Sequence, residues 1–257
     1  MFNKNNISKI WWLSLTIISL INIYVILLQY KNSNNKKLFI LAFIYVIVNA
    51  YRAIWPRIDI ERICFFDTKL STPLIGRFFA TIAELCYIKL FIIVLKKIII
   101  KTKYYNYYNV ILNIVFICIV IAEILSWCGC LSKYQLFNAF EEILWALSAF
   151  IIIIICIFSH KDIKNNKYKN YLLIIAIFCI IYFIFMIFID IPMYIKRNKK
   201  IIINKKESLK DQIKDMNKCY KITKNYNIWK EEIPWLSGYF SFGSWSAILL
   251  LILYNKN

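Results

Sequence analysis

The sequence predicts an all-α, polytopic transmembrane bundle of about seven spanning helices, with a basic amphipathic surface segment before the last one. Hydrophobic residues make up 61% of the 257 residues, against about half in a typical soluble domain. They form long unbroken runs, such as residues 143–158, rather than the short alternating segments of a transmembrane barrel. Only four glycines and four prolines interrupt these runs, which favours long helices.

Seven apolar segments are long enough to cross a bilayer, for which a helix needs about 20 residues. Together they predict one integral membrane domain over residues 1–257, without an internal repeat or a separate soluble domain. Pro73 suits the first position of the third helix, with Thr72 as its N-cap, and Asp190-Ile191-Pro192 ends the sixth. The predicted spans are 10–30, 37–55, 73–95, 107–129, 136–158, 170–192 and 234–254.

The connection before the last span, residues 193–233, is rich in lysine. It is predicted to form an amphipathic helix on the membrane surface that contacts anionic lipid headgroups, with a solvated cap as the alternative. Ser208 followed by Asp211 resembles a capping box at the start of that helix. Its apolar residues recur at helical spacing and are Leu209, Ile213, Met216 and Tyr220.

Basic residues crowd the connections between the apolar runs. The chain has 33 lysines and arginines against 14 aspartates and glutamates, a formal charge of +19. Because these residues flank spanning segments, they are expected to meet lipid headgroups, and no nucleic-acid partner is expected. We call the side that holds the N-terminus and the second, fourth and sixth connections the even side, and the opposite one the odd side.

The count of basic residues bears on how the chain is oriented. Nineteen of them lie on the even side and twelve on the odd side. Cytoplasmic connections carry an excess of lysine and arginine, so this count favours a cytoplasmic even side. Without the long sixth connection the count reverses, so the orientation stays open. The sequence does not identify which membrane holds the chain.

Acidic residues gather towards one side of the predicted domain, since only Asp162 among the fourteen belongs to the odd side. A charged side chain inside a span costs about 2.5–3.5 kcal/mol on insertion scales, which makes such residues candidates for function. Glu84 lies eleven residues after Pro73, about 16 Å along its helix and close to the bilayer midplane. The acids in or at the ends of spans are Glu84, Glu123, Glu141, Glu142 and Asp190.

The helical phase puts these acids on polar faces, which turn away from lipid. The third, fourth and fifth helices, with Arg52 from the second, are therefore predicted to form one pocket near the even side. Buried ion pairs that only fix helix packing are the alternative. The predicted catalytic residues are Glu84, Glu123, Glu141 and Glu142. The predicted substrate-binding residues are Arg52, Arg77, Trp127, Asn138 and Asp190.

This pocket predicts a membrane-embedded enzyme or binder for a polar or amphipathic substrate, lipid-like and anionic. The glutamates would act as general acid or base, or hold a divalent cation. The arginines would hold a phosphate or carboxylate group. A proton- or cation-coupled transporter or channel, with the acids as ion relay, is one alternative, and a non-catalytic membrane scaffold is another.

Several cofactor classes are not expected. The one histidine, His160, lies in an odd-side connection, so neither haem nor a histidine–metal site is expected, and the last span has no lysine for a retinal Schiff base. The eight cysteines form no evident framework, and Cys128-Gly-Cys130 lacks the two-residue spacer of a usual zinc or redox pair. Tryptophans near the span ends suggest an interfacial aromatic belt, made of Trp11, Trp12, Trp55, Trp127, Trp229 and Trp235.

Overall fold

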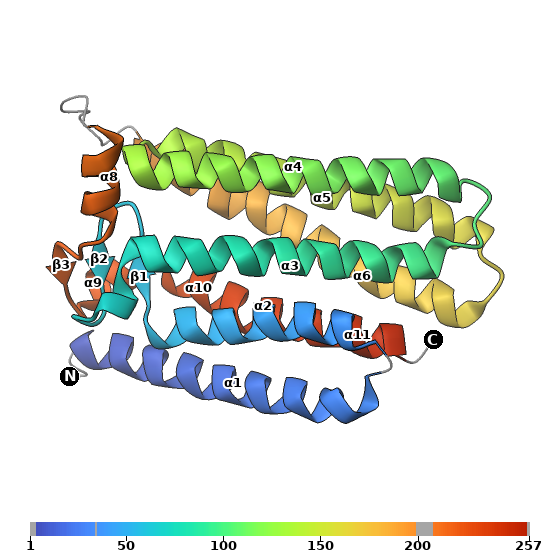
Figure 1. Ribbon diagram of the computed structural model, residues 1–257, viewed down its shortest axis with the longest axis horizontal. Coiled ribbons are helices and arrows are strands. Elements are labelled where there is room, and N and C mark those ends of the chain that lie inside the picture. The colour runs from blue at the N-terminus through green and yellow to red at the C-terminus, as the bar shows by residue number, and fades with distance from the viewer. Residues whose placement is uncertain (1–3, 34, 199–207, 256–257) are drawn as a thin grey trace. The chain divides into compact units, whose positions relative to one another are not determined.

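The computed structural model describes residues 4–33, 35–198 and 208–255, and these residues are mostly helical (Figure 1). Seven helices in these ranges are long and apolar enough to cross a membrane, which confirms the predicted fold class. The first five are α1 (Lys4–Asn32), α2 (Lys36–Ile54), α3 (Pro73–Ile99), α4 (Tyr105–Ser132) and α5 (Gln135–Asp162).

The sixth and seventh spans are each built from two helices joined by a π-helical turn. The sixth consists of α6 (Asn166–Phe185), the turn η2 (Met186–Asp190) and α7 (Ile191–Asn198). The seventh consists of α10 (Ile233–Ser237), the turn η3 (Gly238–Gly243) and α11 (Ser244–Asn255).

The predicted end of the sixth span at Pro192 is wrong, because the helical backbone continues to Asn198. Proline lacks the amide hydrogen of an α-helix and its ring crowds the preceding turn. The wider turn just before it accommodates this defect, since the amide of Ile191 donates to the carbonyl of Met186, five residues back. The helix therefore passes the proline without breaking.

Short polar side chains start several of the helices. Asn35 accepts from the amides of Lys37 and Leu38, and Asn165 caps α6 in the same way. Ser208 accepts from the amide of Asp211 at the start of α8 (Leu209–Met216), as predicted. Helix α3 begins at Pro73 as predicted, but the hydroxyl of Thr72 donates to the carbonyl of Lys69 at 2.9 Å instead of capping it.

The chain divides into two compact units. The first comprises Met1–Leu90, Cys130–Lys133 and Lys205–Asn257, and the second comprises Phe91–Gly129 and Tyr134–Asn204. In the second, α5 packs along α6, η2 and α7. Large apolar side chains stay exposed on its outer faces, including Ile117, Ile181 and Phe188, as expected of helices in contact with lipid. A single integral membrane domain stays a prediction.

In the first unit, α1 and α2 lie side by side and small elements gather beyond their even-side ends (Figure 1). These elements are β1 (Arg57–Ile58), β2 (Ile63–Cys64), the short helix η1 (Lys69–Ser71), α8, β3 (Lys221–Ile222) and α9 (Tyr226–Trp229). Strand β2 pairs antiparallel with β1 and parallel with β3. We call residues 57–72, 130–133 and 208–232 the even-side cap.

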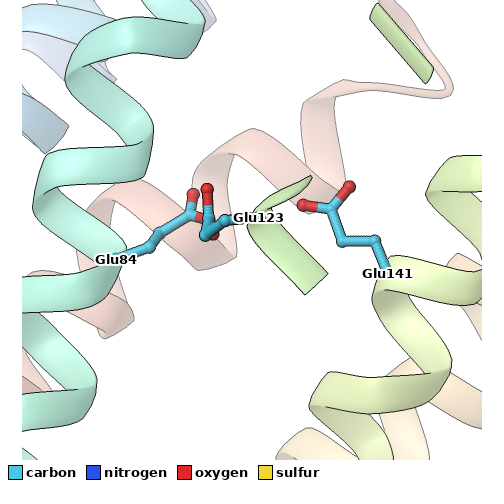
Figure 2. A group of neighbouring side chains, drawn as sticks. All are labelled: Glu84, Glu123 and Glu141. Atoms are coloured by element: carbon cyan, nitrogen blue, oxygen red, sulfur yellow. The ribbon is translucent and has the colours of Figure 1, made fainter. Parts of the chain in front are cut away.

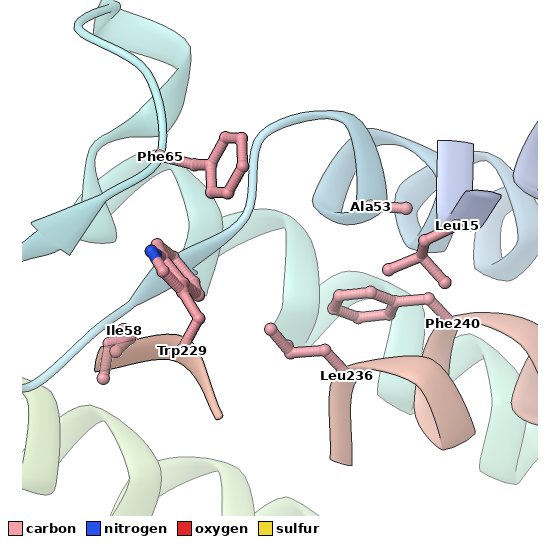
Figure 3. Close-up of a cluster of buried hydrophobic side chains, with 7 residues drawn as sticks. All are labelled: Leu15, Ala53, Ile58, Phe65, Trp229, Leu236 and Phe240. Atoms are coloured by element: carbon pink, nitrogen blue, oxygen red, sulfur yellow. The ribbon is translucent and has the colours of Figure 1, made fainter. Parts of the chain in front are cut away.

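An apolar cluster joins this cap to the helices below it (Figure 3). Trp229, which is fully buried, packs against Phe65 with ring centroids 5.4 Å apart, and its indole nitrogen donates to the carbonyl of Thr223 at 2.8 Å. Trp229 is thus a core residue of the cap and not part of a headgroup-facing belt. The cluster contains Leu15, Ala53, Ile58, Phe65, Trp229, Leu236 and Phe240.

The predicted surface helix of the sixth connection is confirmed as a helix but is shorter than predicted. Helix α8 ends at Met216, so Tyr220 lies beyond it. Met216 is fully buried, whereas Leu209 and Ile213 are exposed. Residues 199–207 of the predicted basic segment lie outside the described residues. Contact of the segment with lipid headgroups stays a prediction.

Candidate functional site

In the first unit, one buried carboxylate is held by two arginines. Arg77 and Glu84, seven residues apart on α3, share a face of the helix, and Arg52 comes from the last turn of α2. Arg52 Nη1 donates to Glu84 Oε1 at 3.3 Å, and Arg77 Nη2 donates to Oε2 at 3.0 Å. The exposed fractions are 8% for Arg52, 5% for Arg77 and 4% for Glu84. We call these three residues the arginine–glutamate group.

Aromatic rings from the seventh span surround Arg52. Its Cζ atom lies 5.0 Å from the ring centroid of Phe240, 5.8 Å from Trp235 and 5.9 Å from Tyr239. Among the described residues Arg52 forms its one hydrogen bond through Nη1. The rest of this guanidinium therefore faces aromatic surface, where cation–π attraction stabilises it.

Polar contacts continue along the same helices beyond Glu84. The side-chain amide of Asn49 donates to the hydroxyl of Ser244 at 3.2 Å, which links α2 to α11. Tyr87 and Ser246 share a hydrogen bond of 2.9 Å between α3 and α11. Serines of α11 thus link the last span to α2 and α3.

In the second unit, two buried glutamates lie together. Glu123 on α4 and Glu141 on α5 are 3% and 4% exposed, and a carboxylate oxygen of each lies within 4.8 Å of the other. Figure 2 shows the carboxylate of Glu141 turned towards Glu123. Two like charges this close in a low-dielectric interior repel each other, so a shared proton or a divalent cation would stabilise the pair. We call these residues the glutamate pair.

The other predicted site residues belong to neither of these two groups. Asn138 packs on Gly129, where a Cβ atom would lie 1.8 Å from its side-chain oxygen. Glu142 and Asp190 are buried, Asp190 in the turn η2, and Trp127 is half-buried. The structure therefore brings together Arg52, Arg77 and Glu84 in one unit and Glu123 and Glu141 in the other. One pocket formed by all of these side chains stays a prediction.

Sequence reasoning missed the disulfide that ties the even-side cap together. Cys64 at the end of β2 is bonded to Cys219, which precedes β3, with their Cα atoms 5.8 Å apart. The signal was that the two cysteines lie in or beside the second and sixth connections, which the four spans between them put on the same side. The six other cysteines, all among the described residues, form no disulfide.

Arg62, also missed, links three connections of the cap. It is 1% exposed. Its Nε donates to Asp215 Oδ2 at 2.9 Å and its Nη2 to the carbonyl of Cys130 at 2.6 Å, while Nη1 donates to the carbonyl of Asp59. Lys133 also reaches Asp215, at 2.9 Å. The second, fourth and sixth connections are therefore joined, which agrees with seven spans.

Comparisons of the chain with protein-family models, with curated proteins and with solved structures find no match. What the site can do is set by its own side chains. Guanidinium groups bind phosphate or carboxylate. Paired carboxylates transfer protons or bind divalent cations through oxygen.

Replacing Glu84 by glutamine should lower the free energy of unfolding by about 3–5 kcal/mol, because both guanidiniums would lose a buried counter-charge. In the double variant Arg52→Gln, Glu84→Gln the loss should be smaller than the sum of the single losses by about 0.5–3 kcal/mol. Denaturant titration in mixed micelles measures these values. Lys89→Gln, an exposed site on the same helix, is the control. Additive losses would contradict the ion pair.

The cap should lose stability in acid. Burial opposes ionisation of Asp215, but hydrogen bonds from Tyr220, Lys133 and Arg62 outweigh it and lower the pKa of Asp215 below its usual 3.8. A lowered pKa in the folded state stabilises the fold above the unfolded-state value, and this stabilisation is lost as the pH falls below 3.8 through the folded-state pKa.

Thermal unfolding followed by tryptophan fluorescence tests this. The unfolding temperature should fall from about pH 5 to about pH 2 in the parent, and should fall less in Asp215→Asn. Asp67→Asn, an exposed acid in the second connection, should behave like the parent. If the unfolding temperature depended on pH equally in all three proteins, Asp215 would not be the cause of the loss of stability in acid.

Proposed function

We propose that this protein is a membrane-embedded enzyme or binder for an amphipathic substrate with an anionic headgroup. The observation that supports it is Arg52, a buried guanidinium in a span, whose one hydrogen bond among the described residues runs to Glu84. Its remaining donors lie among the rings of Trp235, Tyr239 and Phe240. An anionic headgroup would bind the donors, and the rings would contact the adjoining apolar chain.

The glutamate pair supplies the chemistry in the enzyme form of this proposal. Two buried carboxylates within 4.8 Å suit a general acid with a general base, or two ligands of a divalent cation. Glu142, Asn138, Trp127 and Asp190, which belong to the same unit as the glutamate pair, are proposed to contact the substrate. The lysines of residues 193–233 are proposed to concentrate anionic lipid at the same side of the membrane.

Binding of single-chain amphiphiles to the purified protein in nanodiscs tests this function. Alkyl phosphates and alkyl carboxylates should bind more tightly than alkylphosphocholines. Arg52→Gln should weaken binding of the anionic amphiphiles by about tenfold or more, because a charge-assisted hydrogen bond is lost. Arg52→Lys, which keeps the charge but not the planar fork, should give an intermediate value, and Lys89→Gln should match the parent.

The same samples separate enzyme from binder. Conversion of the amphiphile by the parent, lost in Glu123→Gln and Glu141→Gln while binding persists, identifies an enzyme. Binding without conversion identifies a binder. Equal affinity for anionic and zwitterionic amphiphiles, or no effect of Arg52→Gln, would refute the proposal and leave the scaffold function.

Transport is the second candidate, and the π-helical turns favour it. Such turns are frequent at functional sites, and η2 contains Asp190, a buried acid within the sixth span. Buried acids in spans mark ion and proton pathways. Proton or cation flux into proteoliposomes that Asp190→Asn abolishes would favour transport over the first function.

We infer that the even side faces an oxidising compartment outside the cytoplasm. Disulfides such as Cys64–Cys219 form and persist in such compartments. The basic-residue count favours a cytoplasmic even side only through the sixth connection, part of which folds as α8, β3 and α9. Long loops and domains translocate largely regardless of charge, and this connection is the longest of the six. Without this connection seven basic residues remain on the even side against twelve on the odd side.

A fusion of green fluorescent protein to the C-terminus, on the odd side, tests this orientation. The fusion should fluoresce, because the odd side is cytoplasmic, and alkaline phosphatase fused at the same point should be inactive. The native Cys64–Cys219 pair should resist alkylation until a reductant is added. A green fluorescent protein fusion that does not fluoresce, together with an active phosphatase fusion, would show the opposite orientation.

A further inference from the structure

Arg57 lies buried at the start of the even-side cap, apart from the arginine–glutamate group. It is 7% exposed and belongs to β1. Nε donates to Asp59 Oδ1 at 3.1 Å, and Nη1 donates to the hydroxyl of Tyr51 at 3.2 Å and to the carbonyl of Trp55 at 3.3 Å. These three bonds fix the orientation of the guanidinium plane.

The remaining nitrogen of this guanidinium, Nη2, has no hydrogen-bond partner among the described residues, although it is buried. It carries two N–H donors. A buried donor without a partner costs about 1–3 kcal/mol, and more in a charged group. Such a group in a native structure requires an explanation, and a bound water or ion is one of them.

The unpartnered nitrogen lies against the N-terminus of α3. A Cβ atom on Gly76 would lie 1.8 Å from Cζ and 1.9 Å from Nη2 of Arg57, so only glycine leaves room for the guanidinium. Gly76 is in the first turn of the helix, residues 73–76. Because Cβ atoms tilt towards the helix N-terminus, a guanidinium at this point faces the first turn. In that turn the amide of Gly76 donates to the carbonyl of Thr72, whereas the amides of residues 74 and 75 have no acceptor within the helix.

This position is electrostatically unfavourable for a cation alone. The N-terminus of a helix carries about half a positive charge, and α3 is 27 residues long with no acid in its first turn. Asp59 contacts the guanidinium only at Nε. An anion that accepted from Nη2 and from the first-turn amides would satisfy both positive groups at once.

We propose that Arg57 and the N-terminus of α3 form a phosphate-binding site. A phosphate offers several acceptor oxygens to a guanidinium edge and to backbone amides. Pro73 begins the third span at the even side, the depth at which lipid phosphates lie. A phospholipid headgroup and free phosphate share this chemistry, and the depth favours the lipid. The site does not depend on the proposed function, since it uses neither Arg52 nor Glu84.

Binding of short-chain phosphatidylglycerol and of inorganic phosphate to the full chain in detergent micelles tests this site. Arg57→Gln should weaken lipid binding by about tenfold or more. Lys69→Gln removes one positive charge from an exposed site in the same connection and should leave lipid binding unchanged. Inorganic phosphate that binds with the same dependence on Arg57 would identify a free anion, instead of a lipid, as the source of the phosphate.

Hydrogen–deuterium exchange on the parent protein gives a readout that does not rely on the variant folding. Phosphatidylglycerol, or phosphate if that is the source, should slow exchange at residues 74 and 75 at least several-fold. The protection should persist in Arg77→Gln, which separates this site from the arginine–glutamate group. Unchanged exchange at residues 74 and 75 with both probes, or equal lipid binding by the parent and a folded Arg57→Gln, would overturn the proposal.

Discussion

The even-side cap depends on the position of Arg62. Three connections that are far apart in the sequence meet at its guanidinium through Asp59, Cys130 and Asp215. A buried guanidinium must satisfy its donors inside the protein, so these partners cannot separate without a large cost. The backbone of Arg62 adopts a left-handed conformation, with φ 55°, which a non-glycine residue adopts only where its surroundings require it.

The position of the cap in turn determines which groups contact two other buried arginines, Arg52 and Arg57. Phe240 belongs to the apolar cluster beneath the cap and also contacts Arg52. Strand β1 pairs with β2, and this pairing holds Arg57 over Gly76. The two arginines therefore have different environments. Three aromatic rings surround Arg52, whereas Arg57 has one ring, that of Tyr51, together with three hydrogen-bond acceptors. The environment of Arg52 suits an anionic headgroup with an attached apolar chain, and that of Arg57 suits a phosphate group.

The spans could be predicted from the sequence because hydropathy is a local property, and Pro73 marked the start of α3 correctly. The pairing of Arg77 with Glu84 followed from their spacing on one helix. The sheet could not be predicted, because its strands have two residues each and pair β2 with β3 across more than 150 residues of chain. For the same reason Trp229 resembled an interfacial residue, since its burial depends on Phe65 and the cap around it.

The count of basic residues treats the long sixth connection like the short ones. The positive-inside rule reflects the cost of moving lysine and arginine in short, unfolded loops across the membrane. In the sixth connection Asp215 accepts hydrogen bonds from Arg62 and Lys133, so part of the positive charge on the even side is neutralised within a folded cap. A disulfide joins the sixth connection to the second within the same cap. Residues 208–232 of the sixth connection are therefore a folded part of the cap, which distinguishes them from the short connections in that count.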